Sequence, residues 1–326
     1  MSSVPISGKR ALPNGRARSF YGRLHAGEEL AYVIAATAGA AILLITGLIL
    51  IELYSQSAVS RAKFGWTFLA TSVWDPVSGT FGALPFIYGT VVTSIFALII
   101  AIPFGLGSAI FLAEMAPPRI SNALTFLIEL LAAVPSVVYG LLGIFVLVPF
   151  LRESMVPKIK PALGALPLFS GPFYGVSVFA AGLVLSIMIV PFIISVSREV
   201  LMAVARDQRE ASLALGASQW QTVWHVVLPN AFTGIVGSIF LALARALGET
   251  MAVTMVIGNT PQIKASLLAP GYTIAAVIAN EFGEASGDLY RSALIQLGLV
   301  LFGVTFVLNG VARILILTTT GKGAHS

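Results

Sequence analysis

Residues 175–197 read GVSVFAAGLVLSIMIVPFIISVS, an apolar run without a charged side chain. A helix needs roughly 20 mostly apolar residues to cross the hydrocarbon core of a bilayer, so this run is long enough to span a membrane. It is too long and too uniformly apolar for a strand of a membrane β-barrel, which is short and alternates between apolar and polar residues. The run therefore predicts a membrane-spanning α-helix.

The composition of the whole chain agrees with this prediction. Of 326 residues, 57% are hydrophobic and only 10% are charged, whereas soluble proteins carry about 25% charged residues. Too few charges remain to cover a soluble surface, and the high hydrophobicity excludes intrinsic disorder. The excess of 19 Lys and Arg over 14 Asp and Glu is typical of the loops of a membrane protein, so it does not indicate nucleic-acid binding.

Five further runs resemble the first, so we expect an all-α integral membrane protein with six spans. The predicted spans are residues 30–53, 86–112, 125–150, 175–197, 230–257 and 292–317. The first run is longer than the core of a signal peptide, which favours an uncleaved helix. The basic residues Lys9, Arg10, Arg16, Arg18 and Arg23 precede it. They predict a cytoplasmic N-terminus, and six crossings return the C-terminus to the same side.

These spans predict a simple division of the chain. We expect a cytoplasmic tail (1–29), a first transmembrane helix with an outer loop (30–85), a transmembrane core (86–317) that contains a cytoplasmic loop (198–229), and a cytoplasmic C-terminal tail (318–326). Residues 151–174 should form a long outer loop. Residues 272–279 form an apolar run that is too short to cross, so we expect a small outer helix or re-entrant turn there.

The sequence lacks the residues of common catalytic and cofactor sites. It has no cysteine, and its three histidines, His25, His225 and His325, are too far apart for metal-ligand spacing. No glycine-lysine pair completes a phosphate-binding P-loop. We therefore expect no catalytic residue, no metal and no cofactor in this chain, and any ATP hydrolysis must belong to another protein.

The cytoplasmic loop has a distinctive order of residues. EASLALG (residues 210–216) is followed after nine residues by VVLP (226–229). Residues 201–215 favour helix, Gly216 permits a left-handed turn, and Ser218 can cap a second short helix over 219–227. Pro229 suits the first turn of the next span. Apolar side chains in such a loop need a cover, so we expect a partner protein there; they are Ala211, Leu213, Ala214 and Leu215.

This pattern resembles the EAA loop of ABC importer permeases, Glu-Ala-Ala-x3-Gly-x9-Ile-x-Leu-Pro, with Ser and Val at two positions. The resemblance implies the type I (MetI-like) permease architecture over residues 86–317, and a loop that docks on an ATPase subunit. The ATPase-coupling positions that it carries over are Glu210, Ala211, Ser212, Gly216, Val226, Leu228 and Pro229.

The fifth predicted span contains two charged residues, Arg245 and Glu249. A charge near the middle of a bilayer costs roughly 2.5–3.5 kcal/mol on insertion scales, so Arg245 should face the bundle interior or a wet path. Glu249 would lie one turn away on the same helix face. Two interpretations remain open. The residues form a neutralising pair that locks helices together, or Arg245 helps an anion to cross, because its planar fork of donors suits oxyanions.

Two further segments are similar to those of phosphate ABC importer permeases of the PstC type: LAAVPSVVYG (131–140) and ALGETMAV (246–253). The resemblance implies inorganic phosphate as the substrate and the bacterial inner membrane as the location. It also implies a PstA-type permease, an ATPase dimer that uses ATP and Mg, and an extracytoplasmic phosphate-binding protein as partners. The candidate substrate-path residues are Arg245, Glu249, Thr250, Ser136, Tyr139 and Glu129.

The weaker members of this set have structural alternatives. Ser136 and Tyr139 could donate to an oxyanion or bond between helices, and Glu129 could snorkel to the interface. At the level of function, the alternatives are a permease for phosphonate, sulfate or molybdate, and the sibling PstA-type permease. A proton-coupled secondary transporter would need inverted repeats, which are not evident. A membrane scaffold or sensor would not need the loop motif.

Overall fold

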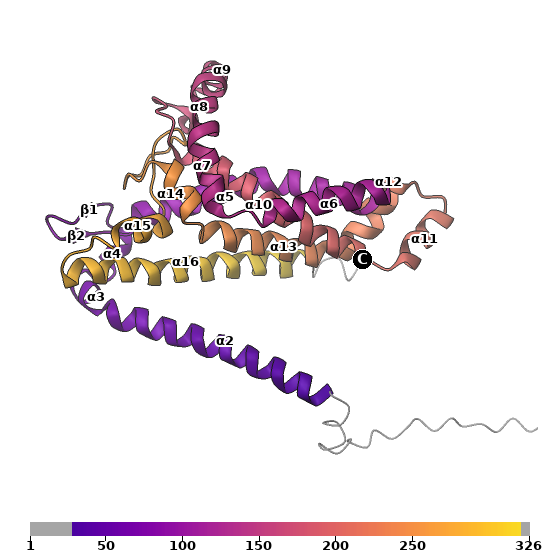
Figure 1. Ribbon diagram of the computed structural model, residues 1–326, viewed down its shortest axis with the longest axis horizontal. Coiled ribbons are helices and arrows are strands. Elements are labelled where there is room, and N and C mark those ends of the chain that lie inside the picture. The colour runs from indigo at the N-terminus through magenta and orange to yellow at the C-terminus, as the bar shows by residue number, and fades with distance from the viewer. Residues whose placement is uncertain (1–27, 321–326) are drawn as a thin grey trace, which may run out of the picture. The chain divides into compact units, whose positions relative to one another are not determined.

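The computed structural model describes residues 28–320 (Figure 1). The chain divides into two units, residues 1–52 and residues 53–326, and each is described by itself. Helix α2 (Glu28–Gln56) begins in the first unit and ends in the second. Its apolar side chains in the first unit are exposed, as in Leu43 at 76%, which suits a helix that faces lipid because its backbone polar groups are satisfied internally.

The described part of the second unit is helical apart from loops and one short hairpin. Its elements are α3 (Ala58–Phe64), α4 (Thr67–Ala70), β1 (Trp74–Asp75), β2 (Thr80–Phe81), α5 (Leu84–Ile110), η1 (Phe111–Met115), α6 (Pro118–Ala132), α7 (Ser136–Leu142), η2 (Gly143–Leu147), α8 (Val148–Phe150), η3 (Leu151–Met155), α9 (Val156–Leu163), η4 (Pro167–Phe169), α10 (Val178–Met202), α11 (Arg206–Ala214), α12 (Gln219–Thr222), η5 (Val223–Val227), α13 (Leu228–Leu247), α14 (Met251–Ile257), α15 (Ile274–Glu281) and α16 (Asp288–Thr320). The segments η1, η2, η3 and η5 are π-helical turns, and η4 is a 3₁₀ turn.

Six helices among the described residues are long and apolar enough to cross a membrane, which confirms the predicted number. They are Ala31–Gln56, Leu84–Met115, Ser136–Ala162, Val178–Met202, Gln219–Leu247 and Asp288–Val311. Four of these helices lie close to the predicted runs. The third and fifth are displaced, because a helix break falls inside each of the predicted runs 125–150 and 230–257.

The predicted third span is wrong as one continuous helix. The chain leaves helical geometry between α6 and α7, and Pro135 precedes α7 with ψ of 139°. Proline has no N–H, and its ring would clash with the carbonyl four residues earlier in a continuing helix. Beyond the break the chain stays helical to Leu163, so the first half of the predicted outer loop 151–174 is helix instead.

The fifth span also differs from its prediction at both ends. α12 continues through η5 into α13, so the expected separate helix over 219–227 is the start of the span itself. At the other end α13 stops at Leu247, and residues 248–250 separate it from α14. Glycine has low helix propensity, and Gly248 stands at this break. The predicted helix over 201–215 is likewise interrupted, between α10 and α11.

The π-helical turns have a common relation to proline. The four turns η1, η2, η3 and η5 each end two residues before a proline, namely Pro117, Pro149, Pro157 and Pro229. A π turn is wider than an α turn, so it makes room for a ring that would otherwise strike the preceding turn. At three of the four sites a helix continues directly past the proline. No such turn precedes Pro135, and there the helix breaks.

The core of the second unit is built around α10. Its span is 72% buried, and it packs against α5, α6, α13 and α14. These crossings require small residues. A Cβ on Gly105 would lie 2.7 Å from Cγ2 of Ile193, and a Cβ on Gly182 would lie 2.3 Å from Cδ1 of Phe96. Glycine at these points lets the helices approach closely, as is common in membrane bundles.

The second unit has two distinct ends (Figure 1). At the hairpin end, which carries β1, β2 and α15, Trp74 Nε1 donates to Oε2 of Glu281 at 2.9 Å, and the Tyr290 hydroxyl donates to the same oxygen at 2.6 Å. The ring of Trp74 also meets Phe81 and Phe86 edge-on. α15 confirms the short helix predicted near residues 272–279. At the opposite, loop end lie α11 and α12.

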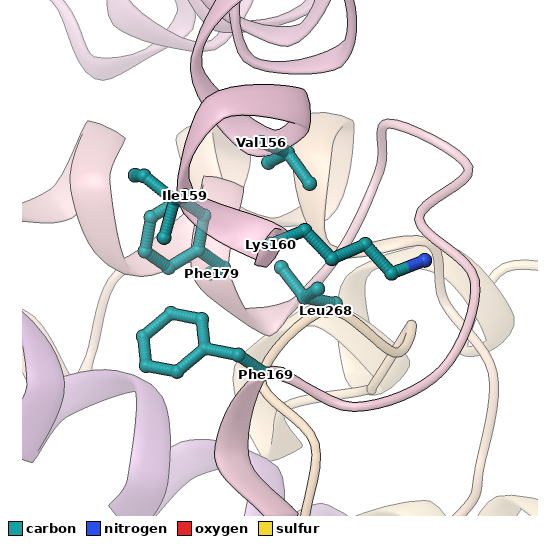
Figure 2. Close-up of a pocket in the computed structure, with 6 residues that line it drawn as sticks. All are labelled: Val156, Ile159, Lys160, Phe169, Phe179 and Leu268. Atoms are coloured by element: carbon teal, nitrogen blue, oxygen red, sulfur yellow. The ribbon is translucent and has the colours of Figure 1, made fainter. Parts of the chain in front are cut away.

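The arm formed by α7, α8 and α9 is packed onto the core at its far end (Figure 2). Val156 and Ile159 of α9 line a cavity with Phe179 of α10 and Leu268, and the Lys160 stem lies along it while its nitrogen points away. The cavity measures about 10 Å³, which is the space of roughly one water molecule. Apolar burial therefore holds α9, where the sequence predicted an outer loop.

Candidate functional site

Two helix breaks bring the two signature segments of the sequence together. LAAVPSVVYG contains the break between α6 and α7, and ALGETMAV contains the break between α13 and α14. α14 packs directly against α7. A Cβ on Gly140 would lie 2.5 Å from Sδ of Met255 and 3.1 Å from Cα of Ala252. Gly140 therefore permits the close crossing that places the two breaks side by side.

Arg245 lies in the last turn of α13, immediately before the second break. Its side chain is exposed on the surface of this chain. Of the two expected surroundings, the interior of this chain's own bundle is therefore not the one observed, and a wet path stays a prediction. Within the described part of the protein its guanidinium makes no hydrogen bond and no ion pair. It is an electrostatic neighbour of Tyr139 on α7. Arg245 is therefore a permanent cation with donors available at the junction of two broken helices.

Glu249 does not neutralise Arg245 in the way the sequence suggested. The predicted pair required a continuous helix, but α13 ends at Leu247 and Glu249 lies inside the break. Its Oε1 instead accepts a hydrogen bond from the backbone N–H of Ala252 at 3.1 Å. A carboxylate at a helix N-terminus satisfies an unpaired N–H group and suits the positive end of the helix dipole. Glu249 therefore caps α14.

The remaining path candidates lie within a few residues of the two breaks. Tyr139 is buried, and its hydroxyl donates to the carbonyl of Leu131 across the α6–α7 break at 2.7 Å. Ser136 is the first residue of α7 and is partly exposed. Thr250 precedes α14, and its hydroxyl donates to the carbonyl of Gly248 at 3.2 Å. Glu129 is exposed in the last turn of α6.

The turn within the loop predicted over residues 198–229 has the local geometry that its sequence predicts. Gly216 has φ of 87°, in the left-handed region that glycine tolerates. Ser218 and Gln221 form a reciprocal capping box at the start of α12. Ser212 on α11 and Thr222 on α12 are hydrogen-bonded at 3.0 Å. The two helices of the loop are therefore joined by a sharp turn and by a direct side-chain contact.

The apolar residues of the loop are left open to a partner. Leu213 is 48% exposed and Leu215 is 91% exposed. Glu210 and Ala211 are also exposed on α11, while Val226 and Leu228 are half-buried where the loop joins its span. Pro229 follows η5. An exposed leucine pair on a short polar helix is a surface of the kind that protein partners cover.

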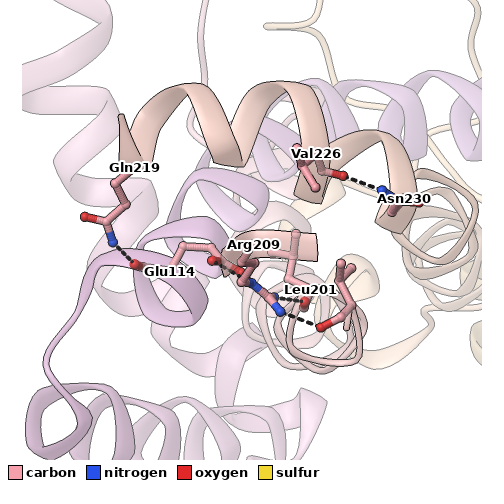
Figure 3. A network of polar contacts seen from close by, with 7 residues as sticks. Glu114, Leu201, Arg209, Gln219, Val226 and Asn230 are labelled. Carbon is pink, nitrogen blue, oxygen red and sulfur yellow. Dashed lines mark hydrogen bonds and ion pairs between the residues drawn. The ribbon is translucent and has the colours of Figure 1, made fainter. Parts of the chain in front are cut away.

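Sequence reasoning missed a polar network at the loop end (Figure 3). Arg209 of α11 forms an ion pair with Glu114 of η1 at 2.8 Å, and the side chain of Gln219 donates to the backbone carbonyl of Glu114. The signal that could have revealed it is Glu114 itself, a lone acid at the end of the second apolar run. Such a charge requires a partner when it is buried.

A family model described as "Binding-protein-dependent transport system inner membrane component" matches residues 101–318. The phosphate transport system permease protein PstC of Mesorhizobium japonicum is 45% identical over 289 residues, which is 87% of this chain and 88% of that protein. The protein of the same name from Xylella fastidiosa is 43% identical over 99% of both chains.

The fold is also found in a solved structure. The crystal structure of a bacterial ABC transporter involved in the import of the acidic polysaccharide alginate contains a chain with a TM-score of 0.53 and 16% sequence identity, covering 89% of this chain and 98% of that one. At this identity the likeness concerns the fold alone. On the family match and the two relatives, the chain belongs to the family of binding-protein-dependent transport system inner membrane components, as a multi-pass permease subunit of the PstC type.

Proposed function

We propose that this chain is the PstC-type permease subunit of an ATP-driven ABC importer that carries inorganic phosphate across the bacterial inner membrane. The observation that carries the proposal is Arg245, an exposed guanidinium that has no partner within residues 28–320 and lies at the junction of two broken helices. Transporters commonly form substrate sites at discontinuous helices. The phosphate transport function of the named relatives agrees with an oxyanion at this point.

The chemistry of the junction suits a tetrahedral oxyanion. A guanidinium keeps its charge at any physiological pH and presents a planar fork of donors to two oxygens at once. Because Glu249 is engaged in capping α14, it does not compete for this fork. Ser136 and Thr250 flank the same breaks. Ser136 supplies a further hydroxyl donor, whereas the Thr250 hydroxyl already donates to the carbonyl of Gly248. Tyr139 lines the site but does not donate to the anion, because its hydroxyl hydrogen is already donated to the carbonyl of Leu131.

This chain supplies only one side of the path in our proposal. Arg245 lies on its surface, and the apolar side chains of α6 and α7 are exposed as well, including Leu131 at 49%, Val138 at 40% and Leu142 at 53%. A second permease of the PstA type would cover this face and complete the path. Substrate would then pass between the two permeases, with Arg245 facing a wet channel rather than lipid.

Movement of the path would be driven from the loop end. Leu213 and Leu215 dock on an ATPase dimer, which binds the ATP and Mg, while this chain binds no cofactor of its own. The loop end and both chain termini face the cytoplasm in this proposal, although residues 1–27 and 321–326 lie outside the described part. A phosphate-binding protein would deliver substrate at the hairpin end. Closure of the ATPase dimer moves the loop, and the path opens alternately to the two sides.

The test is labelled-phosphate uptake in cells that lack this chain and other phosphate importers. Cells receive the wild-type chain, Arg245→Gln, Arg245→Lys or the matched control Arg313→Gln, which alters an exposed arginine late in α16. We expect Arg245→Gln to lower uptake about 100-fold or more, Arg245→Lys to retain part of it, and Arg313→Gln to match the wild type. Copurification of the ATPase verifies assembly of each variant.

Two added conditions separate the alternative functions. Excess sulfate, molybdate or phosphonate should leave phosphate uptake unchanged, and strong competition would move the substrate assignment to that oxyanion. ATP depletion should stop uptake, whereas dissipation of the proton gradient at constant ATP should not. The opposite result would identify a proton-coupled secondary transporter. Full uptake in Arg245→Gln would leave the permease in place but make Arg245 a structural charge.

A further inference from the structure

Arg209 joins three parts of the loop end through one guanidinium (Figure 3). Its Nη2 and Nε donate to the two carboxylate oxygens of Glu114 at 2.8 and 3.2 Å. Nη2 also donates to the carbonyl of Leu201 at 2.7 Å, and Nη1 donates to the carbonyl of Val204. The Leu201 carbonyl lies in the last turn of α10, and Val204 lies in the linker that follows this helix. Arg209 thus ties α11 to η1 and to the end of α10.

Glu114 carries a second link. Its backbone carbonyl accepts a hydrogen bond from Nε2 of Gln219, the first residue of α12. The hydrogen bond between Ser212 and Thr222 joins α11 to α12. The two loop helices are therefore fixed to each other, and each is fixed to η1 at the end of α5. We call Glu114, Arg209 and Gln219 the loop clamp.

The ion pair of the loop clamp differs from an ordinary surface pair. Water screens exposed pairs, which therefore contribute little, but the side chains of Arg209 and Glu114 are only 18% and 9% exposed. The contact is bidentate, which adds geometric specificity. Loss of one partner would leave the other charge half-buried and unpaired, which is costly. α11 packs mainly against α12 and η5. Its polar contact with η1 is made by Arg209.

We propose that Arg209 and Glu114 are positioning residues of the transport cycle, which make α11 and α12 move as one body with the adjoining ends of α5 and α10. The inference rests on the proposed function, in which an ATPase acts on the loop. With the clamp intact, a displacement of α11 is passed to α5 and α10. Without the clamp, α11 moves independently of α5 and α10, and less substrate is imported for each ATP hydrolysed.

The first experiment tests the clamp without reference to the substrate. Hydrogen exchange is measured on the assembled complex with the wild-type chain, Arg209→Gln, Glu114→Gln and the matched control Arg206→Gln. Arg206 lies on the same helix, is exposed and is not part of the clamp. We expect faster exchange of the α11 amides in Arg209→Gln and Glu114→Gln, by about tenfold, because the helix opens locally more often. Arg206→Gln should match the wild type.

The second experiment measures coupling in proteoliposomes as phosphate imported per ATP hydrolysed. We expect this ratio to fall about fivefold in Arg209→Gln, while ATPase activity and copurification of the ATPase stay close to wild type. Arg209→Lys should recover part of the ratio, because it keeps the charge but loses the fork. The double variant with Glu114→Gln should be no worse than Arg209→Gln alone, since the two residues act through each other.

These measurements separate the clamp from the proposed function. If wild-type proteoliposomes import no phosphate, the proposed function fails, and hydrogen exchange still decides whether the clamp orders α11. Unchanged exchange in Arg209→Gln overturns the clamp. Faster exchange with an unchanged import ratio shows that the contacts are merely structural and overturns the positioning role. Equal effects of Arg206→Gln and Arg209→Gln would show a general charge effect, which also contradicts the proposal.

Discussion

Arg209, in the first half of α11, and Arg245, in the last turn of α13, are both arginines of helical segments, yet the protein uses them in opposite ways. Arg209 makes four hydrogen bonds, two of them to a carboxylate. Arg245, in the described structure, makes none and is exposed. Each has a glutamate near it, but Glu114 pairs with Arg209, whereas Glu249 caps α14 and leaves Arg245 alone.

This difference indicates which charge belongs to the scaffold and which is available to a ligand. Donors that are already committed to fixed acceptors stabilise the fold and have no capacity left for a substrate. An unpaired cation at membrane depth is costly, so its retention favours a functional role. The comparison agrees with our proposals that Arg209 positions the loop and that substrate binds at Arg245, and the following predictions are designed to break or sharpen it.

The largest expected effect separates uptake from stability. Arg245→Gln should lower phosphate uptake about 100-fold or more with little change in the melting temperature of the purified complex, because it removes no hydrogen bond or ion pair from the described part of the chain. Arg209→Gln should lower the melting temperature, because it leaves Glu114 unpaired. Equal melting temperatures for the two variants, or a large loss of stability in Arg245→Gln, would erase the distinction between the two arginines.

Gly216→Pro tests the loop side of the comparison. Gly216 has φ of 87°, and proline is restricted to φ near −65°, so the turn between α11 and α12 must rearrange at a cost of roughly 3 kcal/mol. We expect loss of ATPase copurification or of ATPase-driven uptake. Gly283→Ala, at an exposed glycine without close neighbours, is the control. Normal ATPase association and uptake in Gly216→Pro would refute the coupling role of the loop.

Gly140→Ala tests the junction of the two helix breaks. The new Cβ would meet Sδ of Met255 at 2.5 Å and Cα of Ala252 at 3.1 Å. The thioether can move, but the backbone cannot do so cheaply, and overpacking of this kind costs about 1–3 kcal/mol. We expect reduced uptake with the complex still assembled, since α7 and α14 are pushed apart. Gly107→Ala, which meets nothing within 4 Å, should have no such effect.

Glu249→Ala has a small expected effect on stability and sharpens the role of this residue. If Glu249 caps α14, its loss should cost about 1 kcal/mol, visible as a small decrease in melting temperature. Glu249→Gln keeps an acceptor oxygen and should recover most of that loss. A much larger loss that Glu249→Gln does not recover would indicate that the negative charge itself is needed, and would return Glu249 to the role of counter-ion for Arg245.

Local features of the fold could be predicted wherever the governing interaction spans few residues. The number of spans follows from apolar length, the left-handed turn follows from Gly216, and the start of α12 follows from Ser218. The error in the third span also has a local cause, since Pro135 breaks the helix there. Other prolines are accommodated by π-helical turns or inside α5 and α10, and composition does not distinguish these outcomes.

In the candidate site, too, some features could be predicted from the sequence and others could not. The sequence by itself determined the class of protein, the loop motif and the presence of a charged pair in an apolar segment, because hydrophobic length, turn residues and motif spacing are properties of the chain. Only the tertiary structure decided which acid pairs with which base. Glu114 and Arg209 are 95 residues apart in the chain, and they meet because α10 and α5 pack together and carry η1 and α11 to the same end of the bundle.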